Sequence, residues 1–241
     1  FEVYEQVFAF VLSLAEEHKL LSNKTVGVDA TTLEANAAMK SIVRRETGED
    51  WKEYVRRLAE AEGIEIKTDE DLRKYDKKRK NKTVSNEEWT SPADPDSRIA
   101  KMKDGRTHLA YKAEHTVDLE SEFILDASVY HADEGDGETL LKSVTSAQEN
   151  LEEAGVYRDI EEVVADKGYH SKRVVRTLTE AGLRTYISEP ERGRQRWEDQ
   201  PKEQKAVYGN RRRIRGHRGK RLLRSRGELL ERPFAHCYET G

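Results

Sequence analysis

The sequence predicts a mixed α/β domain, in which a sheet is flanked by helices. Two short apolar runs, residues 25–28 and 163–165, have the length and the β-branched content of buried strands. Longer stretches between and after them repeat apolar residues every three to four positions, which is typical of helices. Strands that alternate with helices along the chain favour a layered α/β arrangement.

Each element is predicted from its own pattern of apolar residues and turn residues. In chain order we expect a helix over residues 1–20, strands over 25–32, 108–117 and 122–130, a helix around Leu140, Val144 and Ala147, a strand over 163–165, a helix around Val174 and Leu178, a strand over 185–188 and a helix over 220–236. Residues 33–38 indicate a helical continuation of the first strand. We expect the first three strands to be antiparallel and the later ones to be parallel.

Two long segments interrupt this pattern. Residues 36–92 are predicted to be a charged, helical insertion, in which Trp51, Val55 and Leu58 share one helix face and Thr68 caps a second helix. Residues 189–220 are rich in Arg, Gln, Gly and Pro and predict a basic loop or arm. Trp197 within this arm either anchors it on the core or stacks on DNA.

Composition limits the classes of protein to consider. The chain has 241 residues, enough for one sizeable core, and 37% of them are charged. No apolar run reaches the length of a membrane span. The single cysteine, Cys237, excludes an intrachain disulfide framework and favours a reducing, cytoplasmic location.

The charge distribution indicates a nucleic-acid partner, although the net charge of -4 does not. Residues 208–227 contain no acid and carry a dense group of basic side chains: Arg211, Arg212, Arg213, Arg215, Arg218, Lys220, Arg221, Arg224 and Arg226. A local basic block on an acidic chain is typical of proteins that bind a phosphate backbone.

Two aspartates follow the two buried runs directly. Asp29 ends the first strand and Asp166 ends the strand of residues 163–165. Each could simply cap the structure that follows. If the two strands are neighbours, however, their carboxylates meet at one edge of the sheet and form an oxygen-rich site suited to Mg²⁺ or Mn²⁺. Such pairs, with a third carboxylate, hold the two metals that act on a phosphodiester.

The residues around these aspartates resemble the acidic blocks of DDE transposases. Residues 28–36, 165–169 and 230–236 are similar to the three blocks in order, and residues 94–98 and 109–115 are similar to the intervening segment. The resemblance is to bacterial insertion-sequence enzymes of the IS4/IS5/IS1182 type and covers most of the chain from Thr25 onward. It implies an RNase H-like mixed sheet for residues 23–241, with residues 1–22 as the helical tail of an N-terminal region. That helix could equally pack on the sheet.

The resemblance also implies a catalytic site and an activity. Asp29, Asp166 and Glu231 would be the ligands of two Mg²⁺ or Mn²⁺ ions, in an enzyme that cuts the ends of an element and joins the 3′-hydroxyl to target DNA. Glu228, three residues before Glu231, is the alternative third ligand. The position four residues before Glu231, basic in the family, is Gly227 here. The expected partner is double-stranded DNA, bound by a homodimer.

The residues expected to contact DNA include two beside the second aspartate, Lys167 and Tyr169, although Tyr169 could instead pack under the sheet edge. The others come from the basic block: Arg211, Arg212, Arg213, Arg215, Arg218, Lys220, Arg224 and Arg226. Because the chain begins at Phe1 and stops at Gly241, we interpret it as a fragment of a longer protein.

Two other functions remain compatible with these residues. The first is an RNase H-like nuclease or resolvase that cuts DNA without joining it. The second is a non-catalytic, DNA-binding remnant of a mobile element. Cleavage and strand-transfer assays separate the three.

Overall fold

The computed structural model describes residues 2–80, 82, 84–102, 105–191, 193 and 195–240, with their side chains up to residue 236. The chain forms two compact units. The first, which we call the sheet unit, comprises Phe1–Thr31, Ala113–Tyr130 and Glu134–Gly241. The second, which we call the insertion unit, comprises Thr32–Lys112 and His131–Asp133.

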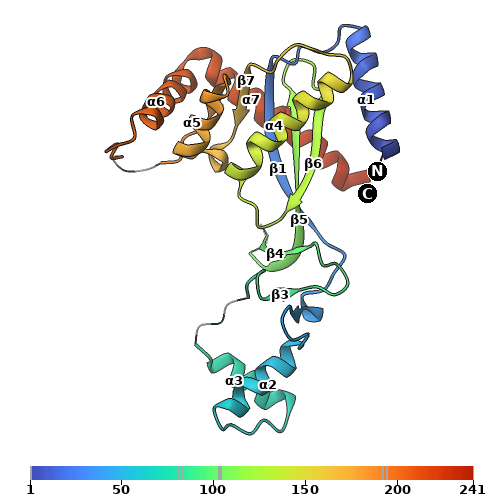
Figure 1. Cartoon of the computed structure of the whole chain (residues 1–241), viewed down its shortest axis with the longest axis vertical. Coiled ribbons are helices and arrows are strands. Elements are labelled where there is room, and N and C mark those ends of the chain that lie inside the picture. Colours follow the sequence, from blue (N-terminus) through green and yellow to red (C-terminus); the bar gives the residue numbers. More distant parts are fainter. Residues whose placement is uncertain are drawn as a thin grey trace. The chain divides into compact units, whose positions relative to one another are not determined.

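The sheet unit is built on five strands, and it confirms the predicted mixed α/β fold of the RNase H-like type. The strands are β1 (Thr25–Glu34), β5 (Thr107–Asp118), β6 (Ile124–His131), β7 (Glu162–Ala165) and β8 (Arg184–Ile187). β6 pairs with β5, and the order then runs β5, β1, β7, β8 (Figure 1). β7 is parallel to both β1 and β8. β1, the strand before the insertion, and β7, the strand after the helix of residues 136–153, are therefore neighbours, as predicted.

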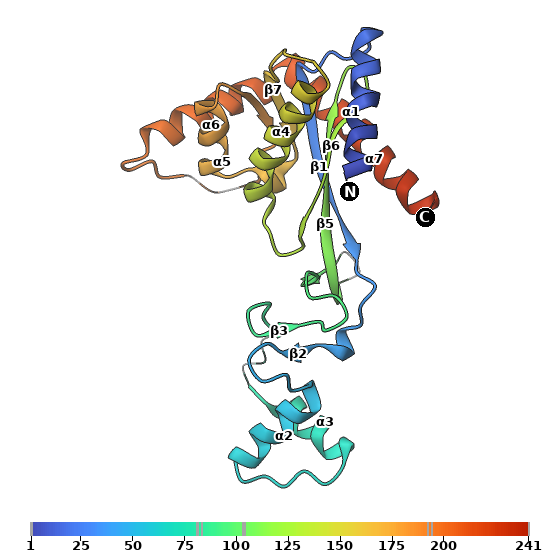
Figure 2. The same cartoon turned by 45° about the vertical axis from the view of Figure 1, so that its right-hand side comes forward.

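Two layers of helices cover the sheet, because alternate residues of a strand face opposite sides. Val163 and Ala165 of β7 belong to a core formed with α1 (Glu2–Glu17), α4 (Asp136–Glu153), α5 (Lys172–Glu180) and α6 (Pro201–Arg215). Val164 faces the other way, into a second core with Leu222 and Leu230 of α7 (His217–Thr240). α7 therefore lies on the face of the sheet opposite α4 (Figures 1 and 2).

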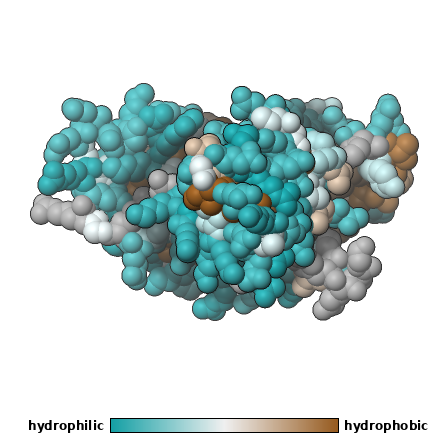
Figure 3. Space-filling view, turned by 90° about the horizontal axis from the view of Figure 1, so that it is seen from below, coloured by the Kyte–Doolittle hydropathy of each residue, from teal (hydrophilic) through white to brown (hydrophobic). Residues whose placement is uncertain are grey.

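The insertion unit contains two helices and short strands, and it extends beyond residues 36–92 at both ends. α2 (Trp51–Ala61) begins with a capping box of Asp50 and Glu53, and α3 (Asp69–Lys78) with one of Thr68 and Asp71. The strands are β2 (Val43–Arg44), paired with β3 (Trp89–Thr90), and β4 (Arg98–Lys101), paired with the start of β5; a short 3₁₀ turn spans Met39–Ser41. The face of the molecule drawn in Figure 3 is largely hydrophilic, as the high proportion of charged residues predicts.

Two predicted elements are corrected by the structure. Residues 33–38 do not form a helix: β1 runs on to Glu34, and the amide of Ala35 donates to the carbonyl of Leu109, because pairing with β5 outweighs the local helical preference. The basic arm of residues 189–220 is not a loop throughout. Residues 201–215 form α6, which begins with Pro201 in its first turn and buries Ala206 and Val207.

The last helix is longer than predicted. α7 continues through Gly227 and Pro233 because Leu230, three residues before the proline, and Phe234, directly after it, are buried. Within the described residues, no helix is both long and apolar enough to cross a membrane.

Candidate active site

Asp29 and Asp166 come from neighbouring parallel strands. The β1–β7 ladder pairs Val26 with Val163 and Gly27 with Val164. Continued by two residues, this register places Asp29 opposite Asp166, on strands about 4.8 Å apart. Both aspartates have the same parity as Gly27 and Val164, so both are directed to the face that α7 covers.

Asp166 is held in place by the turn that follows it. Its Oδ1 accepts a hydrogen bond from the amide of Gly168 at 2.7 Å and caps a 3₁₀ turn over Lys167–Tyr169. Asp166 can therefore both cap the turn and serve as a metal ligand, because the cap fixes one carboxylate oxygen and so orients the carboxylate. Lys167 is exposed at the surface beside it.

Tyr169 packs beneath this turn and is 1% exposed. Its hydroxyl donates to Oε2 of the buried Glu114 at 2.8 Å. Burial, followed by the charge of and the hydrogen bond to Glu114, raises the pKa of Tyr169 far above its usual range, so the phenol stays protonated. Tyr169 therefore packs under the sheet edge, which is the second of the two alternatives considered above, and does not lie at the surface where it could contact DNA.

Asp29 is paired with a cation from α7. Nη2 of Arg226 lies 2.5 Å from Asp29 Oδ1, and the two side chains are 13% and 21% exposed. Nε of Arg226 also donates to the carbonyl of Val28, at 3.4 Å. The guanidinium therefore offsets the charge of Asp29 within the protein, and it is turned toward the sheet.

The orientation of α7 decides which way Glu231 projects. Arg218 pairs with Glu162 at the start of β7, and Arg232 pairs with Glu122, in the turn after β5. One flank of α7 thus faces the amino ends of β1 and β7. Successive helix residues are about 100° apart. Glu231 lies about 100° from Arg232 and about 140° from Arg218 around the helix, so it does not share their flank, and it is exposed.

Two contacts support this placement of α7. A Cβ on Gly27 would lie 2.9 Å from Cδ1 of Leu230, so the helix crosses β1 closely at Gly27. The ring of Phe234 stacks on His115 of β5, with centroids 4.4 Å apart. The amide of Leu119 donates to the carbonyl of Thr25, and in this antiparallel register His115 lies opposite Asp29. Glu228, in contrast, is directed away from the sheet.

The carboxylates have the right chemistry for a divalent cation but are not gathered around one point. Oxygen donors of this type are those that Mg²⁺ and Mn²⁺ prefer. Among the residues that the structure describes, however, no group of three or more His, Cys, Asp and Glu side chains is close enough to hold a metal ion. Asp29 is engaged by Arg226, and Glu231 is exposed on its helix.

Two further acidic residues, neither of them predicted to be a site residue, lie near the turn after Asp166. A Cβ on Gly168 would lie 2.6 Å from Oδ2 of Asp136 and 3.0 Å from Oδ1 of Asp166, so Asp136 reaches the same turn. Glu114 is fully buried and accepts hydrogen bonds from Thr139, Ser143 and Tyr169. The one sequence feature that sets Glu114 apart is that an acid lies inside an apolar strand. Asp136 has no such feature, because acids are common in the first turn of a helix.

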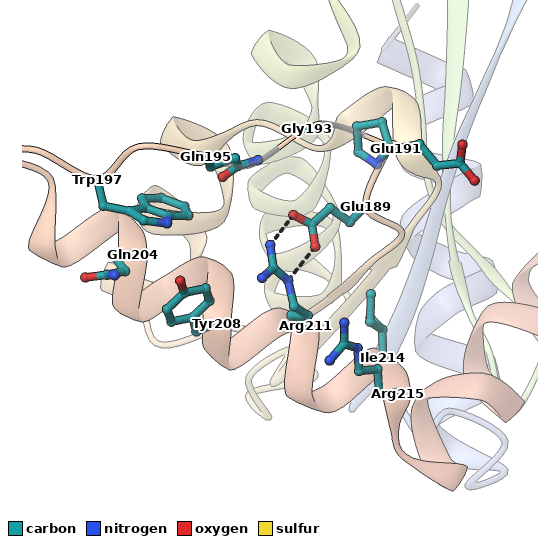
Figure 4. Close-up of a pocket in the computed structure, with 11 residues that line it drawn as sticks. Glu189, Glu191, Gly193, Gln195, Trp197, Gln204, Tyr208, Arg211, Ile214 and Arg215 are labelled. Atoms are coloured by element: carbon teal, nitrogen blue, oxygen red, sulfur yellow. Dashed lines mark hydrogen bonds and ion pairs between the residues drawn. The ribbon is translucent and has the colours of Figure 1, made fainter.

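Several residues of the basic block are used inside the sheet unit. Arg211 makes two hydrogen bonds to Glu189, at 2.8 and 2.6 Å, and lowers the pKa of that carboxyl (Figure 4). Arg213 donates to the carbonyl and the hydroxyl of Thr185, and burial lowers its pKa. Arg218 and Arg226 pair with Glu162 and Asp29. The remaining members are exposed and make no ion pair with any described residue: Arg212, Arg215, Lys220, Arg221 and Arg224.

A polar cavity lies between α6 and the segment that follows β8. Figure 4 shows the rings of Trp197 and Tyr208 on one side of it and the Arg211–Glu189 pair on the other. Trp197 packs against the core and meets Tyr208 edge to face, with centroids 5.7 Å apart. Trp197 therefore anchors its segment on the core, which is the first of the two alternatives considered above.

The sequence also matches the model of a known family. The model of the family described as the transposase DDE domain matches residues 28–238, which is most of the chain and includes all three predicted ligands. No curated protein gives a significant match. No solved structure does either.

Proposed function

The chain belongs to the transposase DDE-domain family, and from this premise we propose that it cuts DNA at the ends of a mobile element and joins the resulting 3′-hydroxyl to target DNA. Membership implies DNA cleavage and joining in transposition. The observation that carries the proposal is the parallel register of β1 and β7, which sets Asp29 opposite Asp166. We further propose that the element is a bacterial insertion sequence of the IS4/IS5/IS1182 type.

Asp29, Asp166 and Glu231 are the proposed ligands of two Mg²⁺ or Mn²⁺ ions. Enzymes of this family generally use divalent metals, which when bound lower the pKa of a water and stabilise the leaving oxygen. The chain's own contribution is placement. The Gly168 amide orients Asp166, Arg226 pairs with Asp29, and the proposal assigns the third ligand to Glu231, exposed on α7.

The exposed cations give a path for the DNA backbone. Lys220, Arg224 and Glu231 lie four and seven residues apart and share one flank of α7. A phosphate backbone bound along Lys220 and Arg224 would lead toward Glu231 and the sheet edge. Arg212 and Arg215, one turn apart on α6, are exposed as well and extend the basic surface.

Two further proposals follow from family resemblance and composition. We propose that two copies act together on DNA, which sedimentation of the protein–DNA complex tests. We also propose a cytoplasmic location, in keeping with the single cysteine.

The deciding experiment compares Asp166→Asn with the unaltered chain on DNA that carries an element end. We expect the substitution to reduce Mg²⁺-dependent cleavage roughly 100-fold or more, because loss of a ligand should cost at least as much as loss of an outer-shell partner. Circular dichroism and DNA affinity should be unchanged. Asp159→Asn, an exposed acid in the loop before β7, is the matched control.

The same assay separates the other functions. A pre-cut DNA with a free 3′-hydroxyl tests joining to a target plasmid. Cleavage without joining would identify a nuclease or resolvase. Binding without either reaction would identify a DNA-binding remnant. Cleavage that survives Asp166→Asn would refute the assignment of the site.

A further inference from the structure

The proposed metal ligand Asp29 already has a cation beside it. Nη2 of Arg226, on α7, lies 2.5 Å from Oδ1 of Asp29. The same oxygen accepts a hydrogen bond from the amide of Ala30 at 3.0 Å. The side chains of Arg226 and Asp29 are only 13% and 21% exposed, so salt screens their attraction less than it would at the surface. Oδ1 of Asp29 is therefore occupied by donors of the protein itself.

Arg226 differs in this respect from the other arginines near it on α7. Arg221 and Arg224 are exposed and make no ion pair with any described residue. The guanidinium of Arg226 is instead turned inward, where its Nε donates to the carbonyl of Val28 at 3.4 Å. It therefore contacts both the backbone and an acidic side chain of β1.

The ordinary role of such an ion pair is to fasten a helix to a sheet. α7 is already fastened by other contacts, because Leu222 and Leu230 pack in the core beneath it. Arg218 of the same helix also pairs with the buried Glu162 of β7. A fastening role alone gives no reason for the cation to lie on a proposed metal ligand.

A divalent cation and the guanidinium would compete for Asp29. Both are attracted to the oxygens of one carboxylate, and two cations held side by side repel each other. Among the described residues, moreover, no three His, Cys, Asp and Glu side chains are close enough together to hold a metal ion. Family membership implies a metal at Asp29, and the structure has an arginine there instead.

A DNA phosphate is the group that would draw Arg226 away from Asp29. A guanidinium pairs with phosphate through the same parallel N–H···O bonds that it makes with a carboxylate. Lys220 and Arg224 are exposed on the same helix, along the proposed path of the DNA backbone. A change of rotamer would turn the long side chain of Arg226 toward that path without moving the helix.

We propose that Arg226 closes Asp29 to divalent metal in the DNA-free protein, and that a DNA phosphate takes up its guanidinium and so opens the site. The inference rests on the proposed function and adds the regulation of its site. DNA binding and metal binding then strengthen each other, because both favour the same outward position of Arg226.

The test measures Mn²⁺ binding by the full chain without DNA, by following free Mn²⁺ with electron paramagnetic resonance. We expect Arg226→Met to tighten Mn²⁺ binding about 10-fold or more, because the competing cation is removed. Arg224→Met is the matched control: it removes an equal charge from an exposed position of the same helix and should leave Mn²⁺ affinity unchanged. If Arg226 only fastens α7 or orients Asp29, Arg226→Met will leave Mn²⁺ binding unchanged or weaken it, and the inference is overturned.

Asp29→Asn shows where the additional Mn²⁺ binds. Added to Arg226→Met, it should abolish the gain in Mn²⁺ affinity; a gain that survives would place the ion elsewhere and overturn the inference. The cleavage assay of Asp166→Asn tests the proposed function separately. If that substitution abolishes cleavage while Arg226→Met leaves Mn²⁺ affinity unchanged, the inference fails and the proposed function stands. If cleavage survives Asp166→Asn, the proposed site is refuted and the inference falls with it.

A second variant keeps the test decisive if Arg226→Met does not fold. Arg226→Gln retains an N–H group for the carbonyl of Val28 but carries no charge. We expect it to tighten Mn²⁺ binding while the protein keeps its circular dichroism spectrum. A pre-cut element-end duplex should then increase Mn²⁺ affinity more in the unaltered chain than in Arg226→Gln, after subtraction of the Mn²⁺ that the DNA binds alone. Equal increases in both proteins would overturn the proposal.

Discussion

At the scale of single residues, charged side chains in the sheet unit are placed by specific hydrogen bonds. Asp166 accepts a hydrogen bond from the Gly168 amide, and Asp29 pairs with Arg226 and accepts a hydrogen bond from the Ala30 amide. Glu231 has neither kind of support and depends on the direction of its helix. The position of this residue is therefore the one that mutagenesis should examine first.

Glu231→Gln and Glu228→Gln form a matched pair on the same helix. As the proposed third ligand, Glu231 should be required for the reaction, so its substitution should reduce Mg²⁺-dependent cleavage roughly 100-fold or more. Glu228 projects away from the sheet, so its substitution should leave the cleavage rate near that of the unaltered chain. Single-turnover cleavage of an element-end DNA measures both.

The opposite ranking would show that Glu228 is the third ligand. Equal, small effects from both would mean that α7 supplies no ligand at all. Thermal unfolding of each variant should match the unaltered chain, since both side chains are exposed.

The site residues that could be predicted from the sequence are those marked by their immediate neighbours in the chain. Asp29 and Asp166 each follow directly on a β-branched run, and that pattern alone located both strand ends. Asp136 lies thirty residues before Asp166, in a Gly- and Asp-rich loop that reads as a turn. Its relation to Gly168 arises from the packing of α4 against the turn, which no short-range pattern encodes.

At the scale of elements, α7 combines three roles on three faces. Leu222 and Leu230 pack on the sheet, Arg218 and Arg232 pair with acids at the amino ends of the strands, and the remaining flank presents Lys220 and Arg224 to solvent. The last face presents cations that make no ion pair with any described residue. Some residues of the basic block therefore make ion pairs within the protein, and others are exposed to solvent.

Neutralising the exposed cations should weaken DNA binding without disturbing the fold. The variant changes Arg212, Arg215, Lys220 and Arg224 to Gln. Each lost phosphate contact should reduce the slope of log affinity against log salt by about 0.9, roughly equally for all DNA sequences. Fluorescence anisotropy at several salt concentrations measures the slope.

A second set of exposed cations provides the control. Arg73, Lys77, Lys78 and Lys80 in and after α3 also lack ion pairs among the described residues. Changing these four to Gln removes the same charge from the insertion unit. If this set lowers the salt dependence and the α6–α7 set does not, the proposed DNA path is wrong.

α6 shows why the predicted arm was wrong over residues 201–215. Its apolar residues are few, and basic residues outnumber them, so periodicity gave a weak signal. The helix is held by buried contacts from other elements instead. Asn210, fully buried, makes hydrogen bonds to both backbone groups of Ile187 on β8.

At the scale of the whole molecule, the sheet unit depends on a buried acid. Glu162 of β7 is 2% exposed and accepts hydrogen bonds from Thr25, Tyr186 and Arg218. Burial alone would raise the pKa of Glu162, but the hydrogen bond from Arg218, with the hydroxyl donors and the arginine charge, outweighs burial and lowers it. A carboxyl with a lowered pKa stabilises the fold above its ordinary pKa and loses that contribution as pH falls through the folded value.

Arg218→Met should therefore destabilise the protein in a pH-dependent way. The difference in free energy of unfolding between this variant and the unaltered chain should be greatest at neutral pH. It should shrink as pH falls below 4.5, the ordinary pKa of the carboxyl, because Glu162 becomes protonated in both.

Urea unfolding across this pH range makes the comparison. Arg221→Met, exposed on the same helix, should show a small difference that does not vary with pH. A constant difference for Arg218→Met would mean that its contribution is packing rather than charge.

The positions of the longer strands along the chain followed from the sequence because each has its own turn signals and apolar run, whereas the pairing of β1 with β7 was implied by the family resemblance. The short strands β2, β3 and β4 did not, since each has only two to four residues and takes its structure from its partner. Ala35, whose amide pairs with Leu109, shows the same dependence on a distant strand.

Gly27 governs how closely α7 can approach the sheet. Its missing side chain leaves room for Leu119 and Leu230, whose carbons would lie 2.7 and 2.9 Å from a Cβ there. Two of the proposed ligands belong to the sheet and the third belongs to α7. The distance between the sheet and α7 therefore also sets the distance between the third carboxylate and the other two. A methyl group at position 27 would push α7 away from the sheet and increase this distance. Catalysis would then fail in a chain that keeps every charged residue and its whole secondary structure.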